Sequence, residues 1–324
     1  MLKIGIGMIR KIVRVTVYFV AGCLLLLGIW IFYLVNFLPN IGYAPELKIK
    51  STPQRLKRGE YLARNIAGCI DCHSTRDDSR FSAPLKEETL GQGGAVFRTE
   101  FGNVIAPNIT PDAIGNWTDG ELFRAITAGV NKDGQPLFPI MPYLDFGRMD
   151  KEDIYDIIAY IRSLKTIRHN VERTSLSFPM NIIVHTIPKR PRFAQKPPED
   201  DTIRYGAYLV QAAGCGHCHT PKEKGQNIAG REFSGGFALP LPSGGFILTA
   251  NITPDKGTGI GSWDKALFVQ RFKAGLDPAF AHTRSPGDRQ TAMPWTSFAN
   301  MRPGDLEAIY DYLRTVRPIQ NKIP

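Results

Sequence analysis

Two short segments of the chain hold cysteine and histidine in the same order and spacing. Residues 67–74 read AGCIDCHS and residues 213–220 read AGCGHCHT. Three chemistries can use the second segment: a zinc site, a disulfide in an oxidising compartment, or a covalently attached haem. Zinc would take four side chains, namely Cys215, His217, Cys218 and His219. A disulfide would join Cys215 to Cys218.

The first segment serves as a control for the second, because Asp71 stands where His217 stands. The common element is C-x-x-C-H, which is typical of c-type haem attachment and needs no His217. On a helical turn, cysteines three positions apart lie on one face, with the histidine close behind. Two thioether links and one axial nitrogen can then meet a single macrocycle. We therefore expect two covalently bound haem c groups, held by Cys69, Cys72, His73, Cys215, Cys218 and His219.

The motif occurs twice because the second half of the chain repeats the first. GEYLARNIAGCIDCH at 59–73 matches GAYLVQAAGCGHCH at 206–219. The other matched pairs are the NITPD segments at 108–112 and 251–255, Trp117 with Trp263, MPYLDFGRM with MPWTSFANM, and DIIAYIRSL with AIYDYLRTV. These matches predict a tandem duplication of one domain.

Capping signals place the helices of each copy. Thr118 and Glu121 predict a capping box, for a helix that ends near Gly129. Further helices are expected at 55–68 and 202–214, at 151–164 after cap Asp150, and at 303–316 with Pro303 in the first position. Because no run of alternating strands appears, we expect an all-α fold with long loops.

The segment from Val15 to Leu38 carries no charge and is long enough to span a bilayer as a helix. We see no small-residue cleavage site after it, so we expect a retained N-terminal transmembrane helix. VAGC at 20–23 leaves open a lipoprotein site at Cys23. The formal charge of +10 falls to +6 without Lys3, Arg10, Lys11 and Arg14, which precede the span. No stripe of basic residues with interleaved aromatic residues remains, which argues against a nucleic-acid-binding protein.

Each copy offers two methionines as the sixth iron ligand. Met149 precedes the helix cap with Ile154 in the first turn, which is the pattern of a hydrophobic staple, and Met301 is placed likewise. Met141 and Met293 lie instead in the loop sequences IMPY and AMPW, where proline follows. We therefore expect Met141 and Met293 to be the axial ligands. His169, His185 and His282 are competing donors, but none recurs in the other copy.

The NITPD segments have two interpretations. Proline and aspartate there are typical of polar turns. Alternatively, Asn108, Trp117, Asn251 and Trp263 pack on haem or bind its propionates, and they are candidate cofactor-binding residues.

The combination of C-x-x-C-H, NITPD, a tryptophan, MPY or MPW and an AYIRSL-type helix resembles the cytochrome c subunits of membrane-bound periplasmic dehydrogenases. Bacterial alcohol, gluconate and aldehyde dehydrogenases have such subunits. The resemblance covers about residues 56–318 and includes the linker piece LSFPMNI. It implies two tandem cytochrome c-like domains, with the anchor in the bacterial inner membrane and both haem domains in the periplasm. Many of those subunits have three haem domains, whereas this sequence has two motifs.

The expected organisation is an N-terminal membrane anchor at 1–40, a linker at 41–55, domain 1 at 56–168, a proline-rich linker at 169–200, domain 2 at 201–318 and a tail at 319–324.

His/Met ligation fills all six iron positions, which favours electron transfer over catalysis at haem. We expect a dihaem cytochrome c that takes electrons from a dehydrogenase subunit or respiratory complex and passes them to quinone, a terminal oxidase or another cytochrome. The alternatives are a dihaem enzyme such as a peroxidase, a free-standing carrier, and a haem-based sensor or structural subunit.

Overall fold

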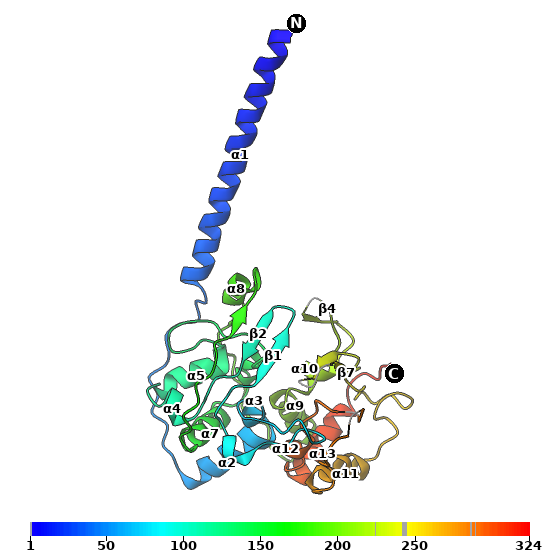
Figure 1. Cartoon of the computed structure of the whole chain (residues 1–324). Coiled ribbons are helices and arrows are strands. Elements are labelled where there is room, and N and C mark those ends of the chain that lie inside the picture. Colours follow the sequence, from blue (N-terminus) through cyan, green and yellow to red (C-terminus); the bar gives the residue numbers. More distant parts are fainter. Residues whose placement is uncertain (1, 224, 242–244, 286, 289) are drawn as a thin grey trace.

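The computed structural model describes residues 2–223, 225–241, 245–285, 287–288 and 290–324, with side chains from residue 7 onward. One long helix, α1 (Leu2–Phe37), stands away from a body formed by the remaining elements (Figure 1). From Gly7 to Phe37 this helix is long and apolar enough to cross a membrane. The predicted uncharged span is therefore helical, and the helix also includes the basic residues before it.

Two sets of helices make up the body, one in the first half of the chain (residues 41–168) and one in the second half (201–324). The first half contains α2 (Pro53–Asn65), α3 (Cys69–Cys72), η1 (Glu87–Thr89), α4 (Pro111–Ile114), α5 (Asp119–Ala128), α6 (Tyr143–Phe146) and α7 (Lys151–Arg162). The second half contains α9 (Thr202–Ala212), α10 (Cys215–His219), α11 (Lys265–Lys273), η3 (Ala274–Leu276), α12 (Trp295–Phe298) and α13 (Pro303–Leu313).

The expected caps form and fix where the helices begin. Thr118 and Glu121 make a complete capping box on α5, and Gly129 ends that helix in the left-handed conformation. Asp150 accepts a hydrogen bond from the Glu152 N–H at the start of α7. Helices α2, α7, α9 and α13 each end two or three residues before their predicted ends, because sequence periodicity locates boundaries less well than caps do.

The same helix pair holds each half together: α2 packs on α7, and α9 packs on α13. The contact depends on one glycine in each pair. A Cβ at Gly59 would lie 1.8 Å from the carbonyl oxygen of Asp156, and a Cβ at Gly206 would lie 1.9 Å from that of Ala308. The helices therefore approach backbone to backbone at equivalent points of the two repeated sequences.

The buried apolar side chains form one cluster that draws on both halves. Leu62 and Ile154 come from the first half, and Leu209 and Leu306 from the second, and all four are fully buried. The halves therefore share a core rather than being joined by the linker alone.

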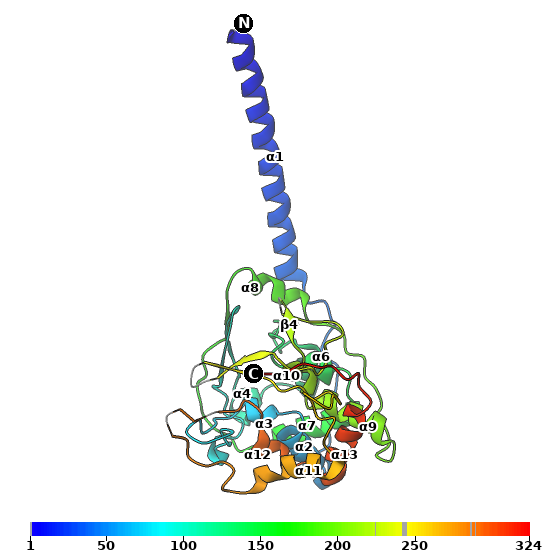
Figure 2. The same ribbon diagram turned by 90° about the vertical axis from the view of Figure 1, so that its right-hand side faces the viewer.

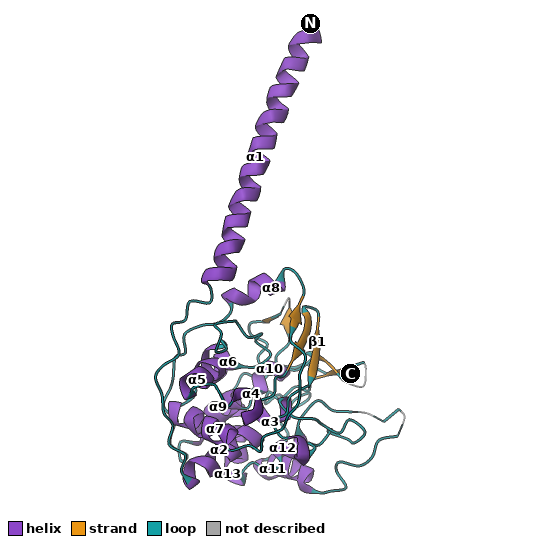
Figure 3. Cartoon of the chain, turned by 60° about the vertical axis from the view of Figure 1, so that its left-hand side comes forward, coloured by secondary structure: helices purple, strands orange, loops and turns teal. Residues whose placement is uncertain are grey.

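Short strands are the departure from the all-α expectation. β1 (Val96–Thr99), β2 (Gly102–Ile105) and β3 (Ser175–Leu176) form an antiparallel sheet, while β4 (Lys222–Glu223) pairs with β5 (Gln226–Asn227) and β6 (Ala238–Pro240) with β7 (Phe246–Leu248). Figure 3 shows that the body is mostly helical, with β1 to one side. Strands of two to four residues are too short to give an alternating pattern, so the sequence did not indicate them.

The linker at 169–200 is partly structured. β3 pairs with β2, and α8 (Met180–Ile183) and η2 (Val184–Thr186) follow it. Figures 1 and 2 both show α8 beside the lower end of α1. Part of the apolar piece LSFPMNIIV therefore packs on α1 through α8 and η2, while Phe178 and Ile183 stay exposed.

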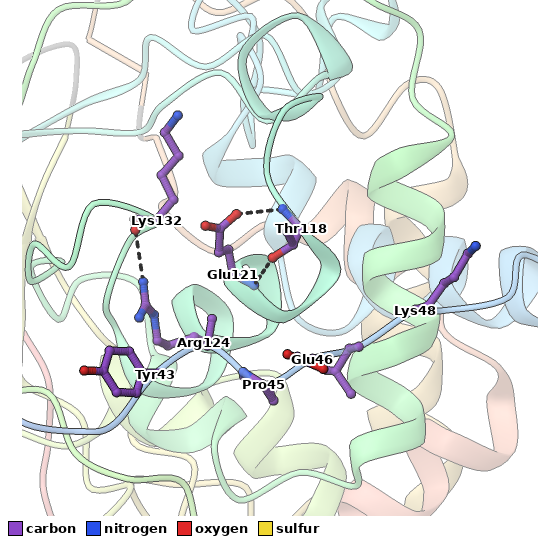
Figure 4. Close-up of a pocket in the computed structure, with 10 residues that line it drawn as sticks. Tyr43, Pro45, Glu46, Lys48, Thr118, Glu121, Arg124 and Lys132 are labelled. Carbon is purple, nitrogen blue, oxygen red and sulfur yellow. Dashed lines mark hydrogen bonds between the residues drawn. The ribbon is translucent and has the colours of Figure 1, made fainter.

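Residues 43–48 lie between α1 and α2 and run along α5. The carbonyl oxygen of Pro45 lies so close to Gly120 that a Cβ there would come within 1.7 Å of it. The backbone N–H of Ile49 donates to the Asp119 carboxylate at 2.8 Å. Figure 4 shows the open pocket between this connection and α5, where both Glu121 hydrogen bonds to Thr118 are drawn. The pocket contains none of the C-x-x-C-H residues, so we do not assign it to a haem.

Candidate haem sites

Each C-x-x-C-H motif begins a short helix directly after a left-handed glycine. Helix α3 follows Gly68 with φ 64°, and α10 follows Gly214 with φ 66°. Glycine adopts such angles without the steric cost of a Cβ. In the first motif the N–H of Cys72 donates to Gly68 O and that of His73 donates to Cys69 O. Both cysteines and the histidine are thus on one helical turn.

The two motif histidines are oriented by identical hydrogen bonds. Nδ1–H of His73 donates to the carbonyl of Pro107 at 2.7 Å, and Nδ1–H of His219 donates to the carbonyl of Ala250 at 2.7 Å. Burial lowers the pKa of both histidines, and the hydrogen bond to the carbonyl partly opposes this. Each ring is then a neutral imidazole with a free lone pair on Nε2, which is the form that binds iron.

A glycine in each half allows the motif to approach the segment that supplies that carbonyl. The N–H of Gly93 donates to His73 O at 2.8 Å, and its φ is +75°. A Cβ there would lie 2.5 Å from the carbonyl carbon of Pro107. The second half repeats the arrangement with Gly235 and Ala250, where the corresponding distance is 2.4 Å. A side chain at either glycine would displace the acceptor that orients the histidine.

The motif cysteines make no disulfide in the structure. Burial raises the pKa of Cys69 and of Cys215 to about 12. Nε2 of His217 is hydrogen-bonded to the Asp145 carboxylate, so that histidine is turned toward the other half. Among the described residues, no three His, Cys, Asp or Glu side chains form a cluster that could hold a metal ion, so the zinc alternative lacks a ligand set. The arrangement fits haem c, which needs two thioethers and one imidazole.

The two methionines of each half differ in burial. Met149 and Met301 are fully buried in the core. Met141 and Met293 are partly buried, in loops that lead into α6 and α12. Both loops have one backbone geometry, in which the carbonyl of the methionine accepts the N–H two residues on, at 2.8 Å. The burial difference is what the staple interpretation expects of Met149 and Met301, while axial ligation by Met141 and Met293 stays a prediction.

The competing histidines have other contacts. Nδ1–H of each donates to a backbone carbonyl, from His169 to Gln92, from His185 to Leu38 and from His282 to Phe280. None of these contacts recurs in the opposite half. The duplication therefore gives no reason to assign any of the three to iron.

Asn108 and Asn251 are buried and hydrogen-bonded to the protein. Oδ1 of Asn108 accepts from the N–H and the hydroxyl of Thr110, both at 2.8 Å, and its Nδ2–H donates to Ile167 O at 2.8 Å. Asn251 makes the same contacts with Thr253 and Ile319. Each asparagine therefore ties the NITPD turn to the segment after the last helix of its half. Their predicted contact with haem stays a prediction beside this structural role.

Trp117 and Trp263 lie at equivalent places and are partly buried against the core. The carbonyl of Trp117 accepts a hydrogen bond from Arg162, and that of Trp263 accepts one from Tyr310 at 2.7 Å. The guanidinium of Arg271 lies 5.6 Å from the centre of the Trp263 ring. These contacts fix the turn before α5 and α11. The suggestion that the indoles pack on haem stays a prediction.

A residue between the two cysteines of each motif contacts the short helix that follows the methionine of the opposite half, α12 for the first motif and α6 for the second. The hydroxyl of Ser297, four residues after Met293, donates to the Asp71 carboxylate at 2.8 Å. His217 stands at the equivalent position of the second motif, and its partner Asp145 comes four residues after Met141. Asp71 also pairs with Arg76 at 3.2 Å.

Sequence reasoning gave His217 no role and did not single out Asp145 or Ser297. Aligning the two copies pairs Asp145 with Ser297 and Asp71 with His217, but nothing in that alignment says that the contacts cross between halves. The carbonyls of Pro107 and Ala250 were missed for a different reason, since a backbone acceptor leaves no signal in side-chain type.

Two C-x-x-C-H helices, each with a histidine hydrogen-bonded to a backbone carbonyl, resemble the haem-attachment turn of c-type cytochromes. Residues 203–317 match the cytochrome c family, so the chain contains a cytochrome c domain, which binds haem c covalently. The chain is 32% identical over 280 residues to the fructose dehydrogenase cytochrome subunit of Gluconobacter japonicus, covering 81% of this chain and 52% of that subunit.

Two further relatives agree. The chain is 28% identical to the cytochrome c subunit of alcohol dehydrogenase (quinone) of Gluconacetobacter polyoxogenes, over 82% of this chain and 56% of the relative. It is 28% identical to a diheme cytochrome c-type of Cereibacter sphaeroides, over 85% of this chain and 90% of the relative. The chain thus resembles the cytochrome c subunits of dehydrogenases, and it spans about half the length of the two dehydrogenase subunits.

Proposed function

We propose that this chain is a membrane-anchored dihaem cytochrome c that relays electrons. Each half would be one cytochrome c domain, at residues 56–168 and 201–318. The single observation that carries the proposal is the repeated histidine geometry, with Nδ1–H held by the carbonyl of Pro107 or Ala250 at 2.7 Å. It leaves one free imidazole nitrogen beside two cysteines in each half, which suits one covalent haem in each.

The protein's residues would hold the cofactor and keep its iron closed to other ligands. Haem c supplies reversible one-electron transfer when bound. Cys69 and Cys72 would form the thioethers in the first half, His73 would bind iron through Nε2, and Met141 would be the second protein ligand of the iron. Cys215, Cys218, His219 and Met293 would do the same in the second half. Ligation by a methionine thioether and an imidazole would leave no open iron position, which would favour electron transfer over a peroxidase reaction.

The contacts between the halves support a relay between the two sites. Ser297 holds the middle of the first motif, and Asp145 holds the middle of the second. Helices α3 and α10 are thus hydrogen-bonded to α12 and α6, the short helices after the methionines of the other half. These contacts hold the two candidate sites within one packed body, which would suit direct electron transfer between two bound haems.

The resemblance and helix α1 support a proposal for the partner and the compartment. We infer that a dehydrogenase subunit or respiratory complex donates the electrons and that quinone, an oxidase or another cytochrome accepts them. Helix α1 would anchor the chain in the bacterial inner membrane, with both haem domains in the periplasm, where haem c is attached.

Cofactor counting tests the proposal. The purified protein should keep two haems per chain after acid acetone, because thioether bonds survive where axial bonds do not. Cys215→Ala with Cys218→Ala should leave one, and Cys69→Ala with Cys72→Ala should leave the other. Both remaining haems should be reduced and reoxidised reversibly. One haem in the natural protein, or rapid oxidation of the reduced protein by peroxide, would overturn the dihaem carrier.

Isolation in mild detergent tests the partner. A dehydrogenase subunit that co-purifies with the chain and reduces it in the presence of substrate would support the inferred donor. A chain that purifies alone but takes electrons from a soluble cytochrome would favour the free-standing carrier.

A further inference from the structure

The lower end of α1 is covered on one side by the linker between the halves. Among the described side chains of α1, Ile31 and Leu34 are the ones that are not exposed, and they are three positions apart on one face. Helix α8 and η2 pack on α1. His185 of η2 is buried and donates from Nδ1 to the carbonyl of Leu38 at 3.0 Å. The linker is therefore fixed at a defined position along α1, near its C-terminal end.

The position of this contact along α1 can be compared with the thickness of a bilayer. Arg14 is the last charged residue before the apolar span. At about 1.5 Å per helical residue, the hydrocarbon core of about 30 Å is crossed in about 20 residues. Leu34 comes twenty residues after Arg14, which places it at the boundary on the side of the body. Because the linker covers that face of α1, α8 lies at the level where acyl chains meet headgroups.

Two large apolar side chains of this segment are exposed. Phe178 is 75% exposed and Ile183 is 42% exposed. Lys189 and Arg190, which follow η2 within a few residues, are exposed and basic. Large apolar side chains beside cationic ones are typical of segments that rest in the membrane interface.

We propose that residues 178–183 form a second membrane contact, in which Phe178 and Ile183 enter the lipid leaflet nearest the body. This inference rests on the proposed anchor role of α1. Its consequence is orientation: a single helix lets the body rotate and tilt, whereas a second contact beside it holds one side of the body against the bilayer. The two candidate haem sites would then keep a fixed height above the membrane.

Fluorescent labels in liposomes test the proposal. The full-length holoprotein with Cys23→Ser has its remaining cysteines in thioethers, so one added cysteine can carry a nitrobenzoxadiazole label. The substitutions are Phe178→Cys, Leu276→Cys and Leu26→Cys. Leu276 is the matched control, because it is apolar, 53% exposed and located in η3, directly after α11 at the end of the body away from α1. Liposomes of phosphatidylcholine and phosphatidylglycerol contain doxyl lipid as quencher.

We expect blue-shifted, quenched emission at positions 26 and 178 and water-like emission at 276. Water-like emission at 178 with a quenched label at 26 would overturn the second contact and leave the anchor intact. Water-like emission at 26 would overturn the anchor, and the second contact with it. Equal quenching at 178 and 276 would mean that the body touches lipid without a preferred side, which also contradicts the proposal. An unchanged haem spectrum in each labelled protein excludes misfolding.

Discussion

Tyr208 on α9 donates its hydroxyl proton to Asp153 on α7 at 2.6 Å, and so joins the two halves of the chain. Tyr61 on α2 makes the equivalent contact with Asp305 on α13. The two tyrosines correspond in the duplication, as do the two aspartates, which are both buried. Each half therefore gives the same residue to the same site on the other, as in an interface with two-fold symmetry.

Replacing Tyr208 by phenylalanine should destabilise this interface. The Asp153 carboxylate would keep its ion pair with Arg58 at 3.1 Å. Because this carboxylate is buried, nothing would replace the hydrogen bond that it loses from the Tyr208 hydroxyl. We expect a loss of about 1–3 kcal/mol in the free energy of unfolding, measured by denaturant titration of the holoprotein in detergent. Tyr155→Phe is the control, because within the described part the Tyr155 hydroxyl makes no hydrogen bond. Equal stability of the two variants would mean that the Tyr208 contact contributes nothing.

The contact between Asp145 and His217 should act on the second haem site although Asp145 belongs to the first half. Asp145→Ala removes a carboxylate next to the second motif, so the second site's oxidised state loses stabilisation and its potential should rise. The double variant with His217→Ala should reveal a coupling free energy of about 0.5–3 kcal/mol, as for residues in contact.

Potentiometric titration of the holoprotein separates the two sites, since each cysteine double variant leaves one of them. Arg148→Ala serves as the control, because Arg148 is exposed and lies three residues after Asp145. A potential shift confined to the first site would show that Asp145 acts only within its own half.

Sequence patterns were sufficient to predict the structural features that occur in both halves and the features that depend on the type of a side chain. The two motifs, the capping box at Thr118 and the cap at Asp150 are local signals, and the structure has them where expected. The crossed contacts could not be predicted, because Asp71 and Ser297 are far apart in sequence and of ordinary type. The short strands escaped notice since two to four residues carry no period.

Gly59 should tolerate no side chain. In Gly59→Ala the new Cβ would lie 1.8 Å from the carbonyl oxygen of Asp156, and backbone cannot move away without separating α2 from α7. We expect a loss of at least about 1–3 kcal/mol in the free energy of unfolding. Gly304→Ala is the matched control on α13, where nothing lies within 4 Å of the new Cβ. It should be neutral or raise stability by up to about 1 kcal/mol. Thermal unfolding of the two variants measures this difference. A Gly59→Ala variant as stable as Gly304→Ala would contradict the close contact between α2 and α7.

Asp156 should give the protein a pH-dependent stability term. Burial raises the pKa of its carboxyl to about 6, while Arg55 at 2.8 Å opposes the rise. An unfolded aspartate titrates near pH 3.9, roughly. The native state therefore binds more protons between these values, so this group's stabilising contribution is complete below about pH 4 and is lost as pH rises through about 6.

Asp156→Asn should abolish this term. The free energy of unfolding of the natural protein, minus that of the variant, should decrease between about pH 4 and 6 and stay level above about pH 7. Urea titrations at several pH values measure it, with Asp112→Asn at an exposed position as the control. A difference that grows with pH would mean that the Arg55 ion pair outweighs burial.

Met141 and Met293 should be the sixth ligands, and Met149 and Met301 should be packing residues. Met141→Ala opens one site to water or a nitrogen base, so that site's potential should fall. The weak thioether-to-iron charge-transfer absorption of the oxidised protein should lose half its intensity in Met141→Ala and half in Met293→Ala. Met149→Ala should leave this absorption unchanged, because the staple interpretation packs its side chain against the first turn of α7 and gives its sulfur no metal. It should instead lower the free energy of unfolding by about 2–5 kcal/mol, as removal of a buried methionine side chain does. If the absorption were lost in Met149→Ala and kept in Met141→Ala, the helix-start methionines would be the ligands and the loop assignment would be wrong.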